Sequence, residues 1–358
     1  MCQISTDRPS IFCILPPYIL RAIAQGGRPQ QRARALRTLA IDNTFRALRT
    51  TPRSPAPTAR RRLGTLGVEA QKHRTIFNAH NTETLPGDLV RQEGSPPSGD
   101  PAVDEGYDGL GATYDFYAAA YDRNSIDDEG LALNATVHFG QEYDNAFWNG
   151  ERMVFGDGDG EIFNRFTISL DVIGHELTHG VTEDEAQLIY FSQAGALNES
   201  VSDVFGSLVK QYILKQTAAQ ADWLIGAGLF TASVHGVALR SMKAPGTAYD
   251  DPVLGKDPQP AHMNDYVRTF EDNGGVHINS GIPNHAFYLV ATKLGGYAWE
   301  KAGRIWYETL RDSQLRPNAG FKRFARLTLT NAQRLYGASS AEQQAVLDAW
   351  NEVGIAIT

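Results

Sequence analysis

Two histidines at a helical spacing are the strongest chemical signal in this chain of 358 residues. They lie in the sequence His175-Glu176-Leu177-Thr178-His179. On a helix, positions i and i+4 share one face, so both imidazole rings can bind a single Zn²⁺ while Glu176 stands beside the open coordination position. The alternative is a chance pair of helical histidines. The pattern predicts two protein ligands of a zinc site.

A zinc enzyme requires a third protein ligand, and its position separates the possible classes. A third histidine six residues beyond His179 is excluded, because Glu185 occupies that position. Twenty residues beyond His179, a second predicted helix carries Glu199, with Asp203 one turn later on the same face. Glu199 can complete a two-histidine, one-carboxylate site, and Asp203 can accept the free ring N–H of His175. The alternative is a pair of exposed helical acids.

A third cluster is the sequence Asp272-Asn273-Gly274-Gly275-Val276-His277. Its two glycines predict a tight backbone course that presents His277 from a loop, where Asp272 can hold the ring in its protonated form. Taken alone, a single loop histidine is an ordinary surface residue. The cluster gains its meaning from the two predicted zinc helices.

The elements that must position these residues change along the chain. Residues 75–165 are rich in Gly, Asp, Tyr and short β-prone runs, whereas long helical periodicity begins at 168 and is clear at 321–335 and 341–353. This order predicts an α+β or two-lobed fold. We interpret the Gly-Asp-Gly-Asp-Gly run at 156–160 as a tight hairpin turn, because it lacks the spaced acids and closing Glu of a calcium loop.

Charge divides the chain near residue 67. Residues 1–67 contain 12 arginines, no lysine and two acids, a net charge of +10, so the remainder carries −18 of the total of −8. An acidic body argues against nucleic acid as the main partner, and no apolar run reaches the ~18 residues of a membrane span. The two cysteines, Cys2 and Cys13, both lie near the N-terminus, so the main body has no thiol for a disulfide scaffold or for thiol catalysis.

The basic N-terminal part predicts an amphipathic helix that includes 32–39, followed by an exposed, proline-rich linker at 50–67. It is either a detachable segment docked electrostatically on the acidic body or a solvated basic tail that could bind nucleic acid. No basic stretch leads into an uninterrupted apolar segment, so we expect no secretory signal. The protein is expected in the cytoplasm as synthesised, and release by a non-classical route stays open.

Together, the three clusters resemble the thermolysin family of zinc metalloendopeptidases, from about residue 70 to the C-terminus. The sequence Pro16-Pro17-Tyr18-Ile19-Leu20 and the short basic segment resemble the protealysin-type branch, which carries a short propeptide. The resemblance implies a two-lobed α+β fold with the zinc site in the cleft between the lobes. It implies a propeptide at 1–67, a β-rich N-terminal lobe at 68–182 that ends in the zinc-binding helix, and an α-helical C-terminal lobe at 183–358.

The resemblance also implies a function, a neutral endopeptidase precursor with one Zn²⁺ per chain. In it, Glu176 would be the general base, Tyr190 and His277 (held by Asp272) would donate hydrogen bonds to the oxyanion, and Arg240 would hold a substrate carbonyl. Asn145 and Ala146 would align the peptide as an extended strand. Cleavage is expected on the amino side of apolar residues, in a pocket lined by Phe163, Phe166, Val172, Ile225 and Leu239.

Self-cleavage in the linker is expected to remove the propeptide, because Leu63, Leu66 and Val68 suit such a pocket. Expected partners are peptide and protein substrates, the chain's own propeptide and a proteinaceous inhibitor. The alternative is a catalytically silent zinc-binding interaction module with the same fold, which loss of Glu176, Tyr190 or His277 would favour.

Calcium is not expected at the double site of the thermolysin family. The matching stretch has Lys210, Leu224 and Ala227 where acids or calcium ligands would be needed, which leaves only Asp171 and Asp222. A lysine ammonium at that place would repel Ca²⁺.

Overall fold

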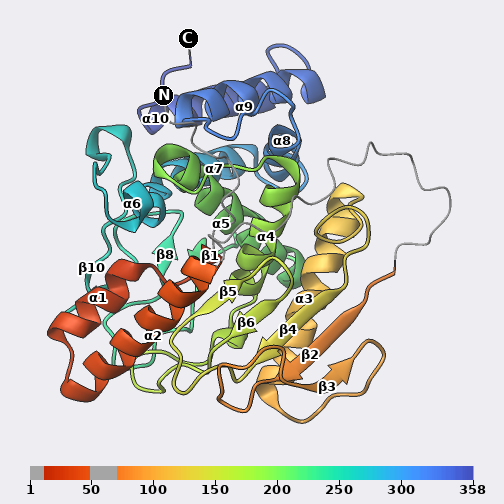
Figure 1. Ribbon diagram of the computed structural model, residues 1–358. Coiled ribbons are helices and arrows are strands. Elements are labelled where there is room, and N and C mark those ends of the chain that lie inside the picture. Colours follow the sequence, from red (N-terminus) through yellow and green to blue (C-terminus); the bar gives the residue numbers. More distant parts are fainter. Residues whose placement is uncertain (1–11, 49–70, 358) are drawn as a thin grey trace, which may run out of the picture.

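The computed structural model describes residues 12–48 and 71–357. The linker predicted at 50–67 lies outside the described residues. In Figure 1 a sheet with one long helix forms the lower right of the molecule, and helices form its upper part. The predicted α+β fold, with a β-rich N-terminal lobe and a helical C-terminal lobe, is confirmed.

Six strands form the mixed sheet of the N-terminal lobe, and its first strand comes from the N-terminal segment. Strand β2 runs parallel to β4, and β4 parallel to β6, whereas β1–β5, β5–β6 and β2–β3 are antiparallel pairs. In spatial order the strands are β1 (Phe12–Cys13), β5 (Ala146–Trp148), β6 (Met153–Phe155), β4 (Leu133–Val137), β2 (Arg74–Asn78) and β3 (Asp88–Gln92).

One long helix of this lobe, α3 (Pro101–Tyr121), was not expected from the sequence. Its start follows ordinary rules, since Asp100 caps the backbone N–H of Ala102 and proline stands in the first turn. Its interior glycines disfavour a helix on propensity alone. Tertiary packing requires them, because a Cβ on Gly109 would lie 2.3 Å from Cδ1 of Ile173.

Two long helices, α4 (Leu170–Glu185) and α5 (Ser192–Leu214), pack against each other in the centre of the molecule, α4 after the sheet and α5 at the start of the helical part. The helices α9 (Phe321–Tyr336) and α10 (Ala341–Glu352) agree with the periodicity predicted at 321–335 and 341–353. The remaining elements are η1 (Phe166–Ile168), β7 (Leu224–Ile225), β8 (Arg240–Ser241), β9 (Asp250–Asp251), β10 (Gly255–Lys256), η2 (Met263–Asp265), α6 (Asp272–Asn279), α7 (Gly281–Leu294) and α8 (Ala302–Leu310).

Aromatic packing joins the last helices into one core. The indole rings of Trp306 and Trp350 stack with centroids 6.1 Å apart, and Phe324 contacts both at 6.2 and 6.3 Å. Among the described residues, no helix combines the length and the hydropathy that crossing a membrane requires.

The N-terminal segment forms a helical hairpin, α1 (Pro17–Gly26) and α2 (Pro29–Leu48), which lies against the body at the lower left of Figure 1. The helix predicted around 32–39 is therefore present and is longer than expected. It buries Ala35, Thr38 and Asp42 at helical spacing while Arg32 and Arg37 stay exposed. Its Phe45 ring packs on Phe139 and Phe147 of the body, at 5.7 and 5.0 Å.

The glycine-rich run at 156–160 is not a hairpin, and this expectation was wrong. Strand β6 ends before it, and the chain continues through a loop into η1. The Oδ1 atom of Asp159 accepts backbone N–H groups of Glu161, Ile162 and Phe163 at 2.7–3.0 Å. This side chain, rather than strand pairing, holds the loop in shape.

A protonated histidine links this loop to α3. His138 Nδ1 lies 2.8 Å from Asp157 Oδ2, and Nε2 lies 2.9 Å from Asp100 Oδ2. The hydrogen bond to Asp157, aided by that to Asp100, outweighs burial and raises the pKa of His138 to about 9. The charged ring therefore stabilises the fold at neutral pH.

We predict that His138→Asn lowers the free energy of unfolding by about 1–2 kcal/mol at pH 6. Because the pKa is raised in the folded state, the contribution is complete below the unfolded value of about 6.5 and disappears as pH rises through about 9. Urea unfolding at pH 6, 8 and 10 measures the effect. An equal loss at pH 6 and pH 10 would contradict a charged bridge.

Candidate active site

Two glycines let the helices that carry the predicted ligands approach closely. A Cβ on Gly174 of α4 would lie 3.0 Å from Cα of Gly206 in α5, and a Cβ on Gly206 would lie 2.3 Å from the carbonyl oxygen of Asp171. Only residues without a Cβ fit this contact. The close approach brings the second helix within reach of His175 and His179.

The three predicted metal ligands meet at one point. His175 Nε2 and His179 Nε2 lie 3.0 Å apart, and the carboxylate oxygens of Glu199 lie 3.5 Å from each of them. All three side chains are buried, and their ligand atoms lie within 4.8 Å of one another. Oε2 of Glu199 has no hydrogen-bond partner. Two imidazoles, one carboxylate and an open fourth position fit a catalytic zinc ion.

Both histidines are oriented by their second ring nitrogen. His175 Nδ1 lies 2.8 Å from Asp203 Oδ1, and His179 Nδ1 lies 2.8 Å from Asn198 Oδ1 and 3.0 Å from the hydroxyl of Ser202. Each Nε2 is thereby directed to the shared point. Burial lowers the pKa of His179, which favours the neutral ring that a metal ligand requires.

Asp203 is itself held by two further side chains. Arg240 donates to it from Nε and Nη2 at 2.9 and 2.8 Å, and Asn284 of α7 donates at 2.8 Å. Burial favours the protonated carboxyl, but Arg240 and His175 outweigh it and lower the pKa of Asp203. The role of Asn284 was missed, because no local pattern in the sequence connects α7 with the zinc helices.

Glu176 lies beside the three ligands and is fully buried. Its Oε2 accepts the backbone N–H of Trp148 at 3.0 Å. Burial, followed by the charge of Glu199, raises the pKa of Glu176. A raised pKa suits a carboxylate that takes up and releases a proton during a reaction.

Tyr190 and His277 approach from the other side. The hydroxyl of Tyr190 donates to Glu199 and lies 3.2 Å from His277 Nε2. Asp272 lies 2.5 Å from His277 Nδ1 and accepts the His277 backbone N–H at 2.9 Å. Burial disfavours the charged ring, but Asp272 and Glu199 outweigh it and raise the pKa of His277.

The expected loop around His277 is only partly present. The backbone from Asp272 to Gly275 has positive φ angles of 51°, 50°, 81° and 77°, which is the tight course that the glycines predicted. His277 itself follows in a helical turn of α6, and its expected place on a loop was wrong.

The N-terminal segment lies along the edge of β5, beside this site. Strand β1 pairs with β5, and the Ile14 N–H donates to the carbonyl of Ala146 at 3.2 Å. The Leu15 N–H donates to Asn145 Oδ1 at 3.1 Å, and Arg240 Nη1 donates to the Ile14 carbonyl at 3.2 Å. His277 Nε2 lies 3.2 Å from the Cys13 carbonyl. Four side chains or backbone groups predicted to bind substrate therefore bind the chain itself.

The five residues predicted to line the specificity pocket are buried in the same hydrophobic core as Ile14 and Leu15. The rings of Phe163 and Phe166 pack against each other at 5.8 Å, and Ile225 pairs with Arg240 across β7 and β8. The pocket itself stays a prediction. The other members are Val172 and Leu239.

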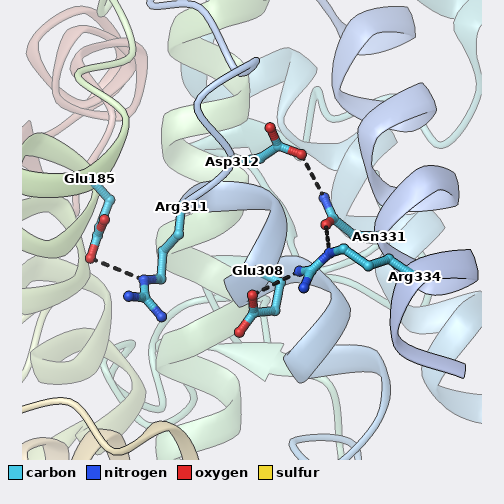
Figure 2. Close-up of a pocket in the computed structure, with 6 residues that line it drawn as sticks. All are labelled: Glu185, Glu308, Arg311, Asp312, Asn331 and Arg334. Carbon is cyan, nitrogen blue, oxygen red and sulfur yellow. Dashed lines mark hydrogen bonds and ion pairs between the residues drawn. The ribbon is translucent and has the colours of Figure 1, made fainter.

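A surface pocket of about 580 Å³ lies elsewhere, between the end of α4 and helices α8 and α9 (Figure 2). Its charged groups largely satisfy one another: Arg311 pairs with Glu185, Arg334 pairs with Glu308 and contacts Asn331, and Asn331 donates to Asp312. It contains none of the predicted site residues, and we assign it no function.

Comparison with known proteins identifies the class. Residues 59–183 match the thermolysin metallopeptidase catalytic domain, and residues 186–355 match its alpha-helical domain. The chain belongs to the thermolysin family of zinc metalloendopeptidases. The expected resemblance is confirmed.

Individual relatives cover nearly the whole chain. It is 56% identical over 351 residues to an extracellular metalloprotease of Pectobacterium carotovorum subsp. carotovorum, with 98% of each chain covered, and 51% identical to Protease PrtS of Photorhabdus, with 96% and 92% covered. The solved precursor of protealysin, a metalloproteinase from Serratia proteamaculans, is 57% identical with a TM-score of 0.87, and 96% of this chain and 100% of that chain are covered. These similarities support a protealysin-like branch with a propeptide.

We predict that Glu199→Gln weakens zinc binding by about 100-fold or more, because a charged ligand is lost. Glu176→Gln should retain zinc and lose turnover, because Glu176 is not among the converging ligands. Elemental analysis after dialysis measures both. Glu129→Gln removes the same charge at an exposed position and serves as the control. Unchanged zinc content in Glu199→Gln would contradict the ligand assignment.

Proposed function

We propose that this chain is a latent endopeptidase with one zinc ion, and that it cleaves peptide bonds on the amino side of apolar residues. The observation that carries the proposal is the extended chain from β1 to Leu15, which follows the path expected of a substrate. Strand β1 pairs with β5, and the two residues after it, Ile14 and Leu15, bind Ala146, Asn145 and Arg240. A peptide that replaced it would present its own backbone to the same groups.

The chemistry follows from the groups around the three ligands. His175, His179 and Glu199 would hold the zinc ion. When bound, it would supply Lewis-acid chemistry, the polarisation of a carbonyl and a lowered pKa, toward ~7, of a water. Glu176 takes the proton from the attacking water and delivers it to the leaving amine.

The remaining groups position and stabilise. Tyr190 and His277 donate hydrogen bonds to the oxygen on which negative charge develops, and Asp272 keeps the His277 ring charged and oriented. A catalytically silent module is the alternative function. It is disfavoured because Glu176, Tyr190 and His277 are all present around the ligand site.

The position of β1 supports the apolar specificity. His277 lies against the Cys13 carbonyl while Arg240 holds the Ile14 carbonyl, so the Cys13–Ile14 bond corresponds to the bond that a substrate would present. The side chain after that bond, Ile14, is fully buried. An apolar residue gains roughly 25 cal/mol per Å² of surface buried there.

We predict that a peptide library is cut mainly before Leu, Phe, Ile and Val. The measurement is mass-spectrometric mapping of cleavage sites, with and without a zinc chelator. A profile in which acidic or basic residues follow the cut bond would contradict the apolar pocket.

We propose that the chain removes its own N-terminal segment by cutting within 50–67. The blocked cleft implies that activity rises when β1 leaves. We predict that the purified wild type loses a segment of about 60 residues, since a proline-rich linker is accessible to proteolysis, whereas Glu176→Ala stays intact. Intact mass followed over time, together with peptidase activity, measures both effects.

Two outcomes would contradict this proposal. Loss of the N-terminus from Glu176→Ala at the wild-type rate, without a contaminating protease, would exclude self-processing. Full activity of the uncut chain would show that the segment serves folding alone.

We propose that no calcium ion binds at the family's double site. The Nζ atom of Lys210 lies 2.7 Å from Asp171 Oδ2, 3.0 Å from Asp222 Oδ1 and 3.0 Å from the carbonyl of Leu224. The ammonium thereby supplies the positive charge among these oxygens. Asp171 and Asp222 raise the pKa of Lys210 despite its burial, which favours the charged form.

We further propose that the protein, expected in the cytoplasm when synthesised, is released by a non-classical route. Relatives from Pectobacterium carotovorum and Serratia marcescens carry names that describe extracellular proteases. A proteinaceous inhibitor is a further proposed partner, because the cleft accepts an extended protein strand.

A further inference from the structure

Three carboxylates of the body surround one arginine of the N-terminal segment, and a fourth lies near them. Arg34 of α2 lies 2.5 Å from Glu142, 3.0 Å from Glu161 and 3.8 Å from Asp159. Asp144 lies beside them, where it feels the charges of Asp159, Arg34 and Glu142. We call these four acids, Glu142, Asp144, Asp159 and Glu161, the Arg34 socket.

One oxygen of the socket is not used by the protein. Asp144 is only 2% exposed, and its Oδ1 has no hydrogen-bond partner. Burial, followed by the charge of Asp159, raises the pKa of this carboxyl, whereas a hydrogen bond from the Asp159 backbone, followed by the charge of Arg34, lowers it. A buried carboxylate oxygen without a hydrogen-bond partner, beside three other acids, is available as a ligand for a cation.

The socket is partly rigid without α2. Asp159 Oδ1 is occupied by three backbone N–H groups of its own loop, while Oδ2 faces Arg34. Asp144 directly precedes Asn145, the residue before β5, and Glu142 lies two residues before Asp144. All four acids belong to the body, so they stay together when the N-terminal segment departs.

Departure of α2 leaves four carboxylates without the guanidinium. Arg28, which pairs with Glu161, leaves with the same segment. The resulting repulsion is relieved by a hard cation that takes carboxylate oxygens, and Ca²⁺ accepts six to eight such ligands in flexible geometry.

We propose that the Arg34 socket is a divalent-cation site that binds Ca²⁺ once the Arg34 guanidinium has left it. The cation and helix α2 use the same acids, so Ca²⁺ favours the form without the docked segment. The effect of Ca²⁺ on the docked segment rests on the proposed removal of that segment, whereas the existence of the cation site does not depend on it.

The test uses the full chain with Glu176→Ala, in which no self-cleavage is expected, so a failure of the processing proposal cannot affect it. Arg34→Ala and Arg34→Gln are added separately, the second to keep a hydrogen-bonding side chain if the first fails to fold. Arg37→Ala is the matched control, because Arg37 is exposed and donates only to the Gln141 carbonyl among the described contacts. Circular dichroism establishes that each variant is folded, and zinc is kept constant.

Calcium titration calorimetry and melting temperature at increasing Ca²⁺ are the measurements. We expect the two Arg34 variants to bind one additional Ca²⁺, with a Kd of about 10⁻⁴–10⁻³ M, and to melt at temperatures that rise with Ca²⁺ concentration. The parent and Arg37→Ala should show neither effect. Adding Asp144→Asn to Arg34→Gln should weaken binding at least tenfold.

Absence of the additional Ca²⁺ from both folded Arg34 variants would overturn the proposal. Equal Ca²⁺ binding by the parent and by Arg37→Ala would place the ion elsewhere in the chain. Binding that survives Asp144→Asn unchanged would show that the buried carboxylate is not a ligand.

Discussion

The contact between α4 and α5 is the constraint on which the active site depends. The helices touch at two glycines, Gly174 and Gly206, and a Cβ at either position would meet backbone atoms at 3.0 Å or less. The ligands from the two helices can converge only at this separation. A zinc ion needs donors about 2 Å away on several sides. A side chain at either glycine would push the helices apart and move Glu199 away from the two histidines.

The groups around the zinc ligands form one connected network rather than separate parts. Asp203 joins His175 to Arg240, and Arg240 in turn holds the backbone of Ile14. The same arginine therefore orients a zinc ligand and fixes the peptide in the cleft. Because both tasks share buried charges, the network loses more than one contact when any member is removed.

The N-terminal segment binds by three distinct physical means. Its strand uses backbone hydrogen bonds that any extended peptide could form. Its helices use both apolar packing, as at Phe45, and the charges that divide the sequence. Arg21 pairs with Glu271, and Arg28 and Arg34 pair with acids of the body. At Lys210 and at Arg34, a side-chain cation lies among carboxylates. The first belongs to the body, whereas the second belongs to the segment whose removal we propose.

The sequence by itself located the three metal ligands, the glutamate that we propose as the base, and the two-lobed class. His175, Glu176 and His179 are related by helical geometry, which depends only on local spacing, and Glu199 lies on the next helix. The charge boundary near residue 67 likewise needed only counting, and it anticipated the arginine contacts to the body.

Tertiary structure decided which residues from distant segments contact each other. Asn284 reaches Asp203 across 81 positions, and the Leu15 amide reaches Asn145 across 130. Helix α3 was missed for the same reason, because its glycines oppose a helix locally, and one of them, Gly109, is required only because Ile173 packs against it. Local periodicity contains no information about such contacts, since they form between surfaces that the fold brings together.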